Sequence, residues 1–261
     1  MRPLTELSRD EAARLEGLLF DLDDTLLDHG RLTEAAYSAL FRLRESDLRL
    51  VAVTGRPAGW GEIIARQWPI DAAVTENGAV ALHRVDPGLR RIDAVGEEER
   101  RSRRIRIAEI VAAICAAHPE LYPADDVGAR VSDFTFDIGE QRKVAPEIVR
   151  AVTTLARELG ARTHLSSVHL HLTLDADDKA TGTLRVLAQL WETDPTVARF
   201  RFAFIGDSEN DAACFAAFRT TLGVRNFAGR PTVGPRFLTT GARGAGFAEA
   251  AARLVELRAG G

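Results

Sequence analysis

The chain has 261 residues, of which 46% are apolar and 28% are charged, and its formal net charge at pH 7 is −4. This length allows one large domain or two of ordinary size, and the composition is ordinary for a soluble globular protein. The charge leaves no basic surplus to neutralise phosphates, and no stretch approaches the ~20 apolar residues that span a bilayer. We therefore expect neither nucleic acid nor a membrane as a partner.

The first residues, MRPLTELSRDEAARLEG, contain no apolar core flanked by small residues, so we expect no secretory signal. The two cysteines, Cys115 and Cys214, lie in helix-like apolar contexts, where reduced thiols are expected. Together these features predict a cytoplasmic protein. They do not indicate an oligomeric state.

Short apolar strands alternate with helical patterns in the first eighty residues. Strands are expected over 17–23, 48–55 and 72–79, and amphipathic helices between them over 33–46 and 58–68. This alternation is typical of βαβ units that form a parallel sheet.

The middle of the chain has a different order. We expect a strand over 90–96, a helix over 97–120, a strand over 128–139, a helix over 145–160 and a strand over 161–175. This order predicts an α+β module inserted into the parallel-sheet domain. The predicted division is a core domain of residues 1–83 and 175–261, with an inserted domain over 84–174.

The βαβ order returns in the last third of the chain. The pattern predicts a helix over 181–192, a strand over 201–207, a helix over 210–220, a strand over 220–226 and a terminal helix within 241–256.

Polar residues follow four strands of the predicted parallel sheet. These are Asp21 and Asp23, then Thr54 and Gly55, then Glu76 and Asn77, and finally Asp207, Asn210 and Asp211. In an open parallel sheet, ligands bind beyond the carboxyl ends of the strands. The usual composition of turns could explain one such strand end. Four of them together indicate a binding crevice.

Four of these side chains are carboxylates, Asp21, Asp23, Asp207 and Asp211, and in one crevice they would repel or take up protons unless a cation were bound. Only oxygen ligands are available at these strand ends, which favours Mg²⁺ held together with waters and a substrate phosphate. Beside Mg²⁺, Asp21 is a competent nucleophile towards phosphorus. Asp23 is placed to protonate the leaving oxygen and then to activate water.

A phosphoryl group also needs donors and positive charge around its oxygens. Thr54 and the backbone of Gly55 can supply donors, and Asn210 is a further substrate-binding candidate. Lysine occurs only at positions 143 and 179, while arginine occurs throughout. Lys179 precedes a predicted helix, whose N-terminus itself favours anions. We therefore assign Lys179 to the phosphoryl group.

With these residues in place, the chain resembles the haloacid dehalogenase superfamily. The stretch FDLDDTL resembles its DxDxT signature, VAVTGR its second motif, Lys179 its third and GDSEND its acidic fourth. The turn TENGA is similar to that of members with a Cof-type (class IIB) cap, which is inserted between the second and third motifs. Asp24 occupies the variable position of the signature, where we expect it to shape the turn into Thr25.

The resemblance implies a Rossmann-like parallel-sheet core with a C2-type α+β cap, and a phosphatase acting on a sugar phosphate or a similar small phosphorylated metabolite through an aspartyl-phosphate. Asp21 and Asp23 would be catalytic, and Mg²⁺ the cofactor. Two alternatives stay open: a sugar phosphomutase using the same intermediate, and a non-catalytic module that binds a phosphorylated metabolite. Net phosphate release from a monophosphate distinguishes a phosphatase from a phosphomutase. Retention of a ligand without turnover would support the binding module.

His169 and His171 lie on one face of a predicted strand. This pair has three interpretations. It could bind a metal, it could lie on a face of the cap turned to the substrate, or it could lie on a solvated or hydrogen-bonded strand face. The basic run RRSRRIR follows Glu97 and Glu99 at helical spacing and indicates a solvated helix face.

Overall fold

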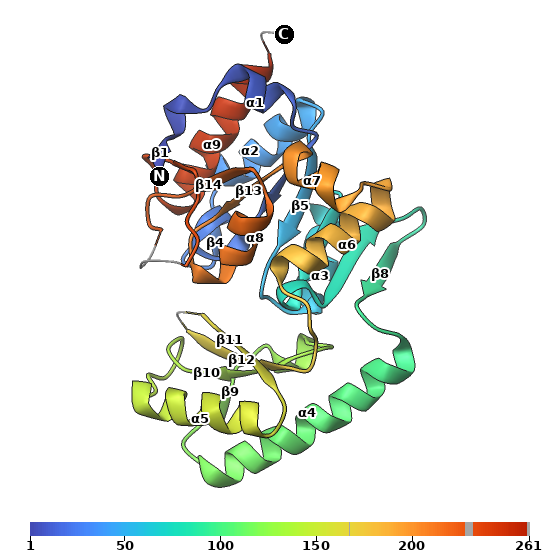
Figure 1. Ribbon diagram of the computed structural model, residues 1–261, viewed down its shortest axis with the longest axis vertical. Coiled ribbons are helices and arrows are strands. Elements are labelled where there is room, and N and C mark those ends of the chain that lie inside the picture. The colour runs from blue at the N-terminus through green and yellow to red at the C-terminus, as the bar shows by residue number, and fades with distance from the viewer. Residues whose placement is uncertain (167, 228–231, 260–261) are drawn as a thin grey trace.

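The computed structural model describes residues 1–166, 168–227 and 232–259, and these residues form two large sheets and one short two-stranded sheet, with helices around them. The larger sheet has nine strands in the order β1-β15-β14-β13-β2-β5-β6-β7-β8. The smaller one has four, in the order β11-β12-β10-β9, and lies below the large sheet in Figure 1.

The large sheet is parallel over seven of its strands and antiparallel at one edge, where β7 and β8 form a hairpin. Its strands are β1 (Arg2–Pro3), β2 (Gly17–Phe20), β5 (Arg49–Val53), β6 (Ala72–Thr75), β7 (Val80–Arg84), β8 (Leu89–Asp93), β13 (Phe202–Gly206), β14 (Thr220–Gly223) and β15 (Phe237–Leu238). A separate short hairpin joins β3 (Leu27–Asp28) and β4 (Arg31–Leu32).

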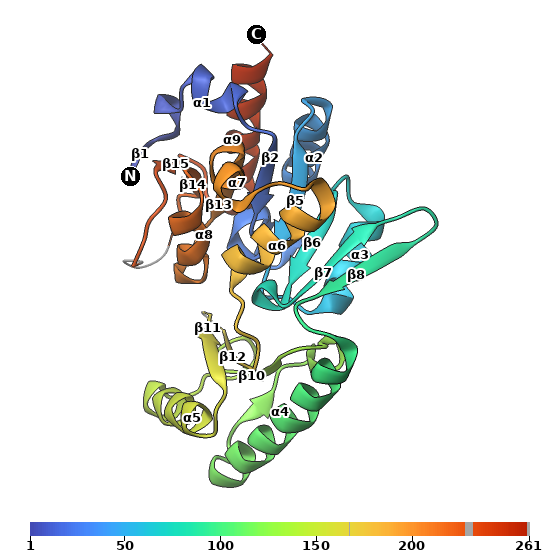
Figure 2. The same cartoon turned by 45° about the vertical axis from the view of Figure 1, so that its right-hand side comes forward.

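Helices cover both faces of this sheet, which explains why its central strands are apolar along their whole length. In β2, Leu18 and Phe20 belong to one buried cluster and Leu19 to the other. Figure 2 shows α6 and α7 in front of the strands and α2 behind them. The helices are α1 (Arg9–Ala13), α2 (Glu34–Glu45), α3 (Ala58–Gln67), α6 (Lys179–Trp191), α7 (Pro195–Arg201), α8 (Ala212–Ala217) and α9 (Arg243–Arg258).

The small sheet is antiparallel and packs two helices on one face. Its strands are β9 (Tyr122–Pro123), β10 (Phe134–Asp137), β11 (Arg162–Leu165) and β12 (His169–Thr173), and its helices are α4 (Glu97–Ala117) and α5 (Pro146–Glu158). Phe136, Leu170 and Leu172 lie in one buried cluster with both helices. Because side chains alternate along a strand, His169 and His171 lie on the opposite face, the one turned towards the large sheet in Figure 1.

Two chain segments connect the small sheet and its helices to the large sheet, and a single buried guanidinium joins them. Arg100, at the start of α4, donates to Asp93 at the end of β8, with a shortest contact of 2.5 Å. It also donates to Asp175, which follows β12, with a shortest contact of 2.6 Å. Both connecting segments are therefore fixed to the same side chain.

The predicted α/β class with an inserted α+β module is confirmed, and the strands and helices predicted for the parallel sheet are present. The strand predicted over 90–96 corresponds to β8, but its assignment to the inserted module is wrong, because β8 pairs with β7 in the large sheet. The division at residues 84 and 174 stays a proposal, and this pairing favours a first boundary near residue 94.

The single strand predicted over 161–175 is wrong as well, because the described residues form the antiparallel pair β11 and β12. Residue 167, which that prediction included, lies outside the described residues. The sequence of residues 161–175 contains no glycine or proline that would mark the turn between the two strands. No helix among the described residues is long and apolar enough to cross a bilayer.

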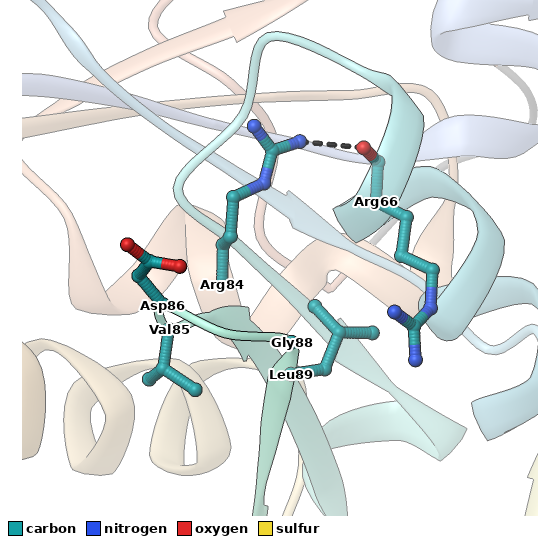
Figure 3. A pocket seen from close by; sticks show the side chains of 6 residues that line it. All are labelled: Arg66, Arg84, Val85, Asp86, Gly88 and Leu89. Atoms are coloured by element: carbon teal, nitrogen blue, oxygen red, sulfur yellow. Dashed lines mark hydrogen bonds between the residues drawn. The ribbon is translucent and has the colours of Figure 1, made fainter.

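A cavity of about 340 Å³ lies at the turn between β7 and β8 (Figure 3). Because β7 runs antiparallel to β6, this turn lies at the amino ends of the parallel strands, away from their carboxyl ends. The guanidinium of Arg84 donates to the carbonyls of Ala65 and Arg66 at the end of α3. It thereby satisfies carbonyls at a helix C-terminus, a structural role.

Phe136 is fully buried between the small sheet and its helices. We expect Phe136→Ala to lower the free energy of unfolding of this module by about 3–5 kcal/mol, because the substitution leaves a cavity that the packing cannot fill. Urea unfolding followed by circular dichroism measures this. Phe200→Ala is the matched control, since Phe200 is 51% exposed and its loss should cost less than about 1 kcal/mol. Equal effects of the two substitutions would contradict the assignment of Phe136 to the core of the module.

Candidate active site

The site begins where β2 ends. Asp21 continues the strand by donating its N–H to the carbonyl of Ile205, and its side chain is buried. The chain then turns, with Asp24 in the left-handed region at φ 54°. Arg243 donates to the Asp24 carboxylate at 2.8 Å, and Asn226 donates to the Asp24 carbonyl at 2.9 Å. Asp24 therefore shapes the turn, as expected.

A buried ammonium joins two of the carboxylates. Lys179 is 2% exposed, and its Nζ donates to Oδ1 of Asp21 at 2.7 Å and to Oδ1 of Asp211 at 2.8 Å. Asp211 is fully buried, and its Oδ2 accepts the N–H groups of Asp207 and Ser208. Residues from three distant parts of the chain thus meet at the carboxyl edge of the sheet.

Lys179 reaches this position because the start of α6 packs directly on the turn after β6. A Cβ atom at Gly182 would lie 2.3 Å from Cα of Gly78, and one at Gly78 would lie 2.1 Å from the carbonyl oxygen of Asp178. Only glycine at both positions permits this approach, and Gly78 also has φ 106°. Asp178 caps the helix by accepting the N–H of Thr181, so α6 begins at the lysine.

Asp207 completes the cluster and lies at the end of β13, beside β2. Its Oδ1 accepts the hydroxyl of Thr25 at 3.3 Å. One carboxylate oxygen from each of Asp21, Asp207 and Asp211 lies within 4.8 Å of the others. Since the strands run parallel, the sheet geometry alone brings these ends together, as the sequence predicts.

Burial dominates the electrostatics of this cluster. Burial, followed by the neighbouring carboxylates, raises the pKa of Asp21 well above its usual range, against the lowering effect of Lys179. Burial and Asp211 likewise raise the pKa of Asp207 to about 7. One ammonium thus faces three buried carboxylates, an excess of negative charge that a divalent cation would balance.

The fourth predicted ligand, Asp23, is not part of this group. Its carboxylate is 51% exposed and accepts hydrogen bonds from two nitrogens of Arg56, the shortest of which is 2.6 Å. Arg56 in turn lies over the ring of Trp60, 3.9 Å from its centroid. The side chain of Asp23 lies at the solvent side of the crevice, and its assignment as a metal ligand stays a prediction without support from this arrangement.

The predicted phosphate-binding residues lie on the neighbouring strand ends. Thr54 is buried, and its hydroxyl accepts the N–H of Arg56. Gly55 lies against the side chain of Asn77, whose Oδ1 accepts the side-chain amide of Asn210 at 3.1 Å. The structure therefore brings Thr54, Gly55 and Asn210 to the same edge as Asp21. Their contacts with a substrate stay predictions.

The histidine pair has protein partners. His171 is buried, with Nδ1 3.0 Å from Asp133 and 3.1 Å from the hydroxyl of Thr135, while Nε2 of His169 lies 2.8 Å from Glu140. Burial lowers the pKa of His171. Of the three interpretations, the hydrogen-bonded strand face on the side of the large sheet fits these contacts.

Sequence reasoning placed Arg56 at the second strand end without giving it a role, and it missed Arg130. Arg56 lies within the VAVTGR motif, but nothing in the sequence indicates its ion pair with Asp23. Arg130, from the small module, donates to the carbonyl of Gly55 at 3.1 Å. An arginine within the strand predicted over 128–139 gives no sign of this contact.

Comparisons with known proteins agree with this geometry. Residues 18–88 match the family model of haloacid dehalogenase-like hydrolases, and no curated protein sequence matches the chain. A protein of Thermoplasma acidophilum is similar in structure, with 17% identity, a TM-score of 0.73 and coverage of 93% of this chain and 99% of its own.

Two phosphatases are also similar in structure. The sucrose-phosphatase of Synechocystis sp., solved with sucrose and phosphate, has 20% identity and a TM-score of 0.63, with 92% of this chain and 98% of that chain covered. A sugar phosphatase of HAD subclass IIB has 16% identity and a TM-score of 0.58, with 86% and 93% covered. The sequence match over residues 18–88 and the shared fold agree with the resemblance to haloacid dehalogenase-like hydrolases that the sequence motifs indicate.

The excess negative charge predicts a metal-dependent stability. In the metal-free protein the pKa of Asp207, about 7, lies above its ordinary value of 3.8, so stability falls as pH rises through the range between these values. We expect Mg²⁺ to raise the melting temperature at pH 8 and to raise it less at pH 5, where protons already occupy the site. Differential scanning fluorimetry with and without Mg²⁺ measures this, and an equal shift at both pH values would contradict it.

Proposed function

We propose that this chain is a Mg²⁺-dependent phosphatase that hydrolyses a small phosphorylated metabolite, with a sugar phosphate as the expected substrate, through an aspartyl-phosphate on Asp21. The observation that carries the proposal is the buried cluster of three carboxylates around Lys179 at the carboxyl edge of the sheet. The similarity to a sucrose-phosphatase and to a subclass IIB sugar phosphatase supports the substrate class.

The residues present fit a hard divalent cation. All the candidate ligand atoms are carboxylate oxygens, as Mg²⁺ prefers, and the charge of the cluster is negative even with Lys179 included. Asp21 and Asp207 would hold the ion. Both oxygens of Asp211 already accept protein donors, which makes Asp211 a support for Lys179 and for the loop after β13. When bound, Mg²⁺ would neutralise negative charge on the phosphoryl oxygens.

Asp21 carries out the first step. Its Oδ1 is held by Lys179, and no protein donor contacts its Oδ2 among the described residues, which leaves that oxygen for phosphorus. The bond from Asp21 to phosphorus forms while the ester P–O bond breaks. Lys179 and the Thr54–Gly55 segment stabilise the charge on the phosphoryl oxygens. In the second step water attacks phosphorus, the bond to Asp21 breaks, and phosphate is released.

Asp23 transfers the protons. In the first step it protonates the oxygen of the leaving group, and in the second its carboxylate takes a proton from the attacking water. In this structure the carboxylate of Asp23 is paired with the guanidinium of Arg56. To act as the acid in the first step, Asp23 must leave Arg56, and substrate entry between the two side chains would separate them.

The small module would act as a cap. Its polar sheet face is turned to the large sheet, so it would contact the part of the substrate beyond the phosphate and exclude water from the reaction (Figure 1). A cytoplasmic location and a small-molecule partner belong to the same proposal.

Substitution of the nucleophile tests the mechanism. We expect Asp21→Asn to lower the rate of p-nitrophenyl phosphate hydrolysis with Mg²⁺ at least about a thousandfold, because an amide cannot form the phosphoenzyme. Release of p-nitrophenolate measures the rate. The control is Glu62→Gln, which changes an exposed carboxylate on α3. A near wild-type rate in the Asp21 variant would refute its role as nucleophile.

Asp23→Asn should lower kcat by about 10²–10⁴-fold, since general acid–base catalysis contributes that much. The loss should be smaller for p-nitrophenyl phosphate than for a sugar phosphate, because p-nitrophenolate leaves without protonation. Comparison of kcat for the two substrates measures this difference. Equal losses would argue against proton transfer to the leaving group.

A panel of sugar, nucleotide and glyceryl phosphates, followed by phosphate release, tests the substrate class. We expect the highest kcat/KM for a sugar monophosphate, with stoichiometric release of phosphate. Conversion to an isomeric sugar phosphate without net release would instead indicate a phosphomutase. Binding without turnover of any member would indicate a binding module.

A further inference from the structure

Glu76 is a buried carboxylate that the proposed chemistry does not use. It is 3% exposed and lies at the carboxyl edge of the sheet, directly after β6. Glu76 and Asn77 both have left-handed backbone conformations, with φ 50° and 53°. Such conformations are unfavourable for residues other than glycine and persist where surrounding contacts fix them.

The contacts that fix this turn link it to the second strand end. The N–H of Glu76 donates to the carbonyl of Arg56, and the N–H of Asn77 donates to the carbonyl of Thr54. The carboxylate of Glu76 in turn accepts the N–H of Ala58 at the start of α3. The turn after β6 and the Thr54–Arg56 segment are therefore one hydrogen-bonded unit.

The same carboxylate also binds the small module. Oε1 accepts the N–H of Val131 at 3.0 Å, and Oε2 accepts the N–H of Ser132 at 2.7 Å, the hydroxyl of Ser132 at 2.6 Å and the N–H of Asp133 at 3.2 Å. These donors belong to residues 130–133, which we call the docking loop. With Ala58 they supply five donors to one carboxylate, more than a carboxylate needs for simple burial.

Arg130 makes a second contact from the docking loop to the core. Its guanidinium is buried and donates to the carbonyl of Gly55 at 3.1 Å. It also binds Asp126 and Asp133 of its own module, at 2.9 and 3.0 Å. Asp133 then contacts His171 on the inner face of the small sheet. A continuous set of bonds therefore runs from the Thr54–Arg56 segment to His171 on β12.

From these contacts we propose that Glu76 is a positioning residue, which docks the small module on the phosphate-binding edge of the core and so fixes the inner face of its sheet over Asp21. The small module is joined to the core by two chain connections, near residues 93 and 175, which Arg100 links to each other. The docking loop supplies the third attachment, and it is made of hydrogen bonds that can break. Burial and the neighbouring Asp133 raise the pKa of Glu76, and the ion pairs of Arg130 offset this charge at the interface.

Hydrogen–deuterium exchange of the full-length protein with Mg²⁺ and without substrate tests the attachment. In Glu76→Gln an NH₂ group replaces one accepting oxygen and faces N–H donors. We expect the amides of Val131, Ser132 and Asp133 to exchange about tenfold faster, the loss expected for hydrogen bonds to a charged acceptor.

The matched control is Glu249→Gln. Glu249 accepts the N–H groups of Thr240 and Gly241 and the hydroxyl of Thr240 in the same manner, but within the core. This control should loosen residues 240–241 and leave the docking loop unchanged. If Glu76→Gln does not fold, Ser132→Ala tests the attachment instead. We expect exchange in the docking loop to rise roughly threefold in that variant, because one hydroxyl donor is lost. Unchanged exchange in the docking loop of the folded variant overturns the proposal.

A kinetic measurement separates positioning from mere structural support, and only this measurement depends on the proposed phosphatase function. For p-nitrophenyl phosphate with Glu76→Gln, we expect KM to rise at least about threefold while kcat stays within about twofold. A fall in kcat at unchanged KM would indicate only a loss of folded enzyme and would overturn the positioning role. If the wild-type protein hydrolyses no phosphate ester, the proposed function fails, and the exchange experiment still decides whether Glu76 docks the module.

Discussion

The whole site depends on one buried charge arrangement, the ammonium of Lys179 between the carboxylates of Asp21 and Asp211. Taking these groups out of water is costly, and removal of one partner of such a buried pair costs about 3–5 kcal/mol in other proteins. The arrangement therefore requires precise placement of three chain segments. Parallel strands supply two of them, and the contact between two glycines supplies the third by bringing the start of α6 against the turn after β6.

Much of this arrangement could be predicted from the sequence because it follows from local rules. Apolar strands that end in Asp21 and Asp207 must place these residues at one edge of a parallel sheet, and a helix that begins at Lys179 places an ammonium near them. The parallel order, the helices and the clustering of the carboxylates were predictable for this reason. The order of strands and helices in the middle of the chain predicted the inserted module, and the family resemblance agreed with its position.

The rest depends on contacts between segments that leave no local pattern. The strand β8 has the same apolar alternation whether it pairs with the large sheet or the small one, and only tertiary pairing decides between them. The spacing of the sequence places the carboxylate of Asp23 beside that of Asp21. In the structure Asp23 instead pairs with Arg56 and lies outside the cluster of Asp21, Asp207 and Asp211. Glu76 could be noticed as a polar strand end, but its partners lie some fifty-five residues further along the chain.

The bridge made by Arg100 has a consequence for motion. Because one guanidinium binds both Asp93 and Asp175, the two connecting segments cannot slide past each other without breaking a buried ion pair. A rotation of the small module about an axis through this bridge would preserve both bonds. Such a rotation would change the distance between His171 on the small sheet and Asp21 on the large one while the bridge stays intact.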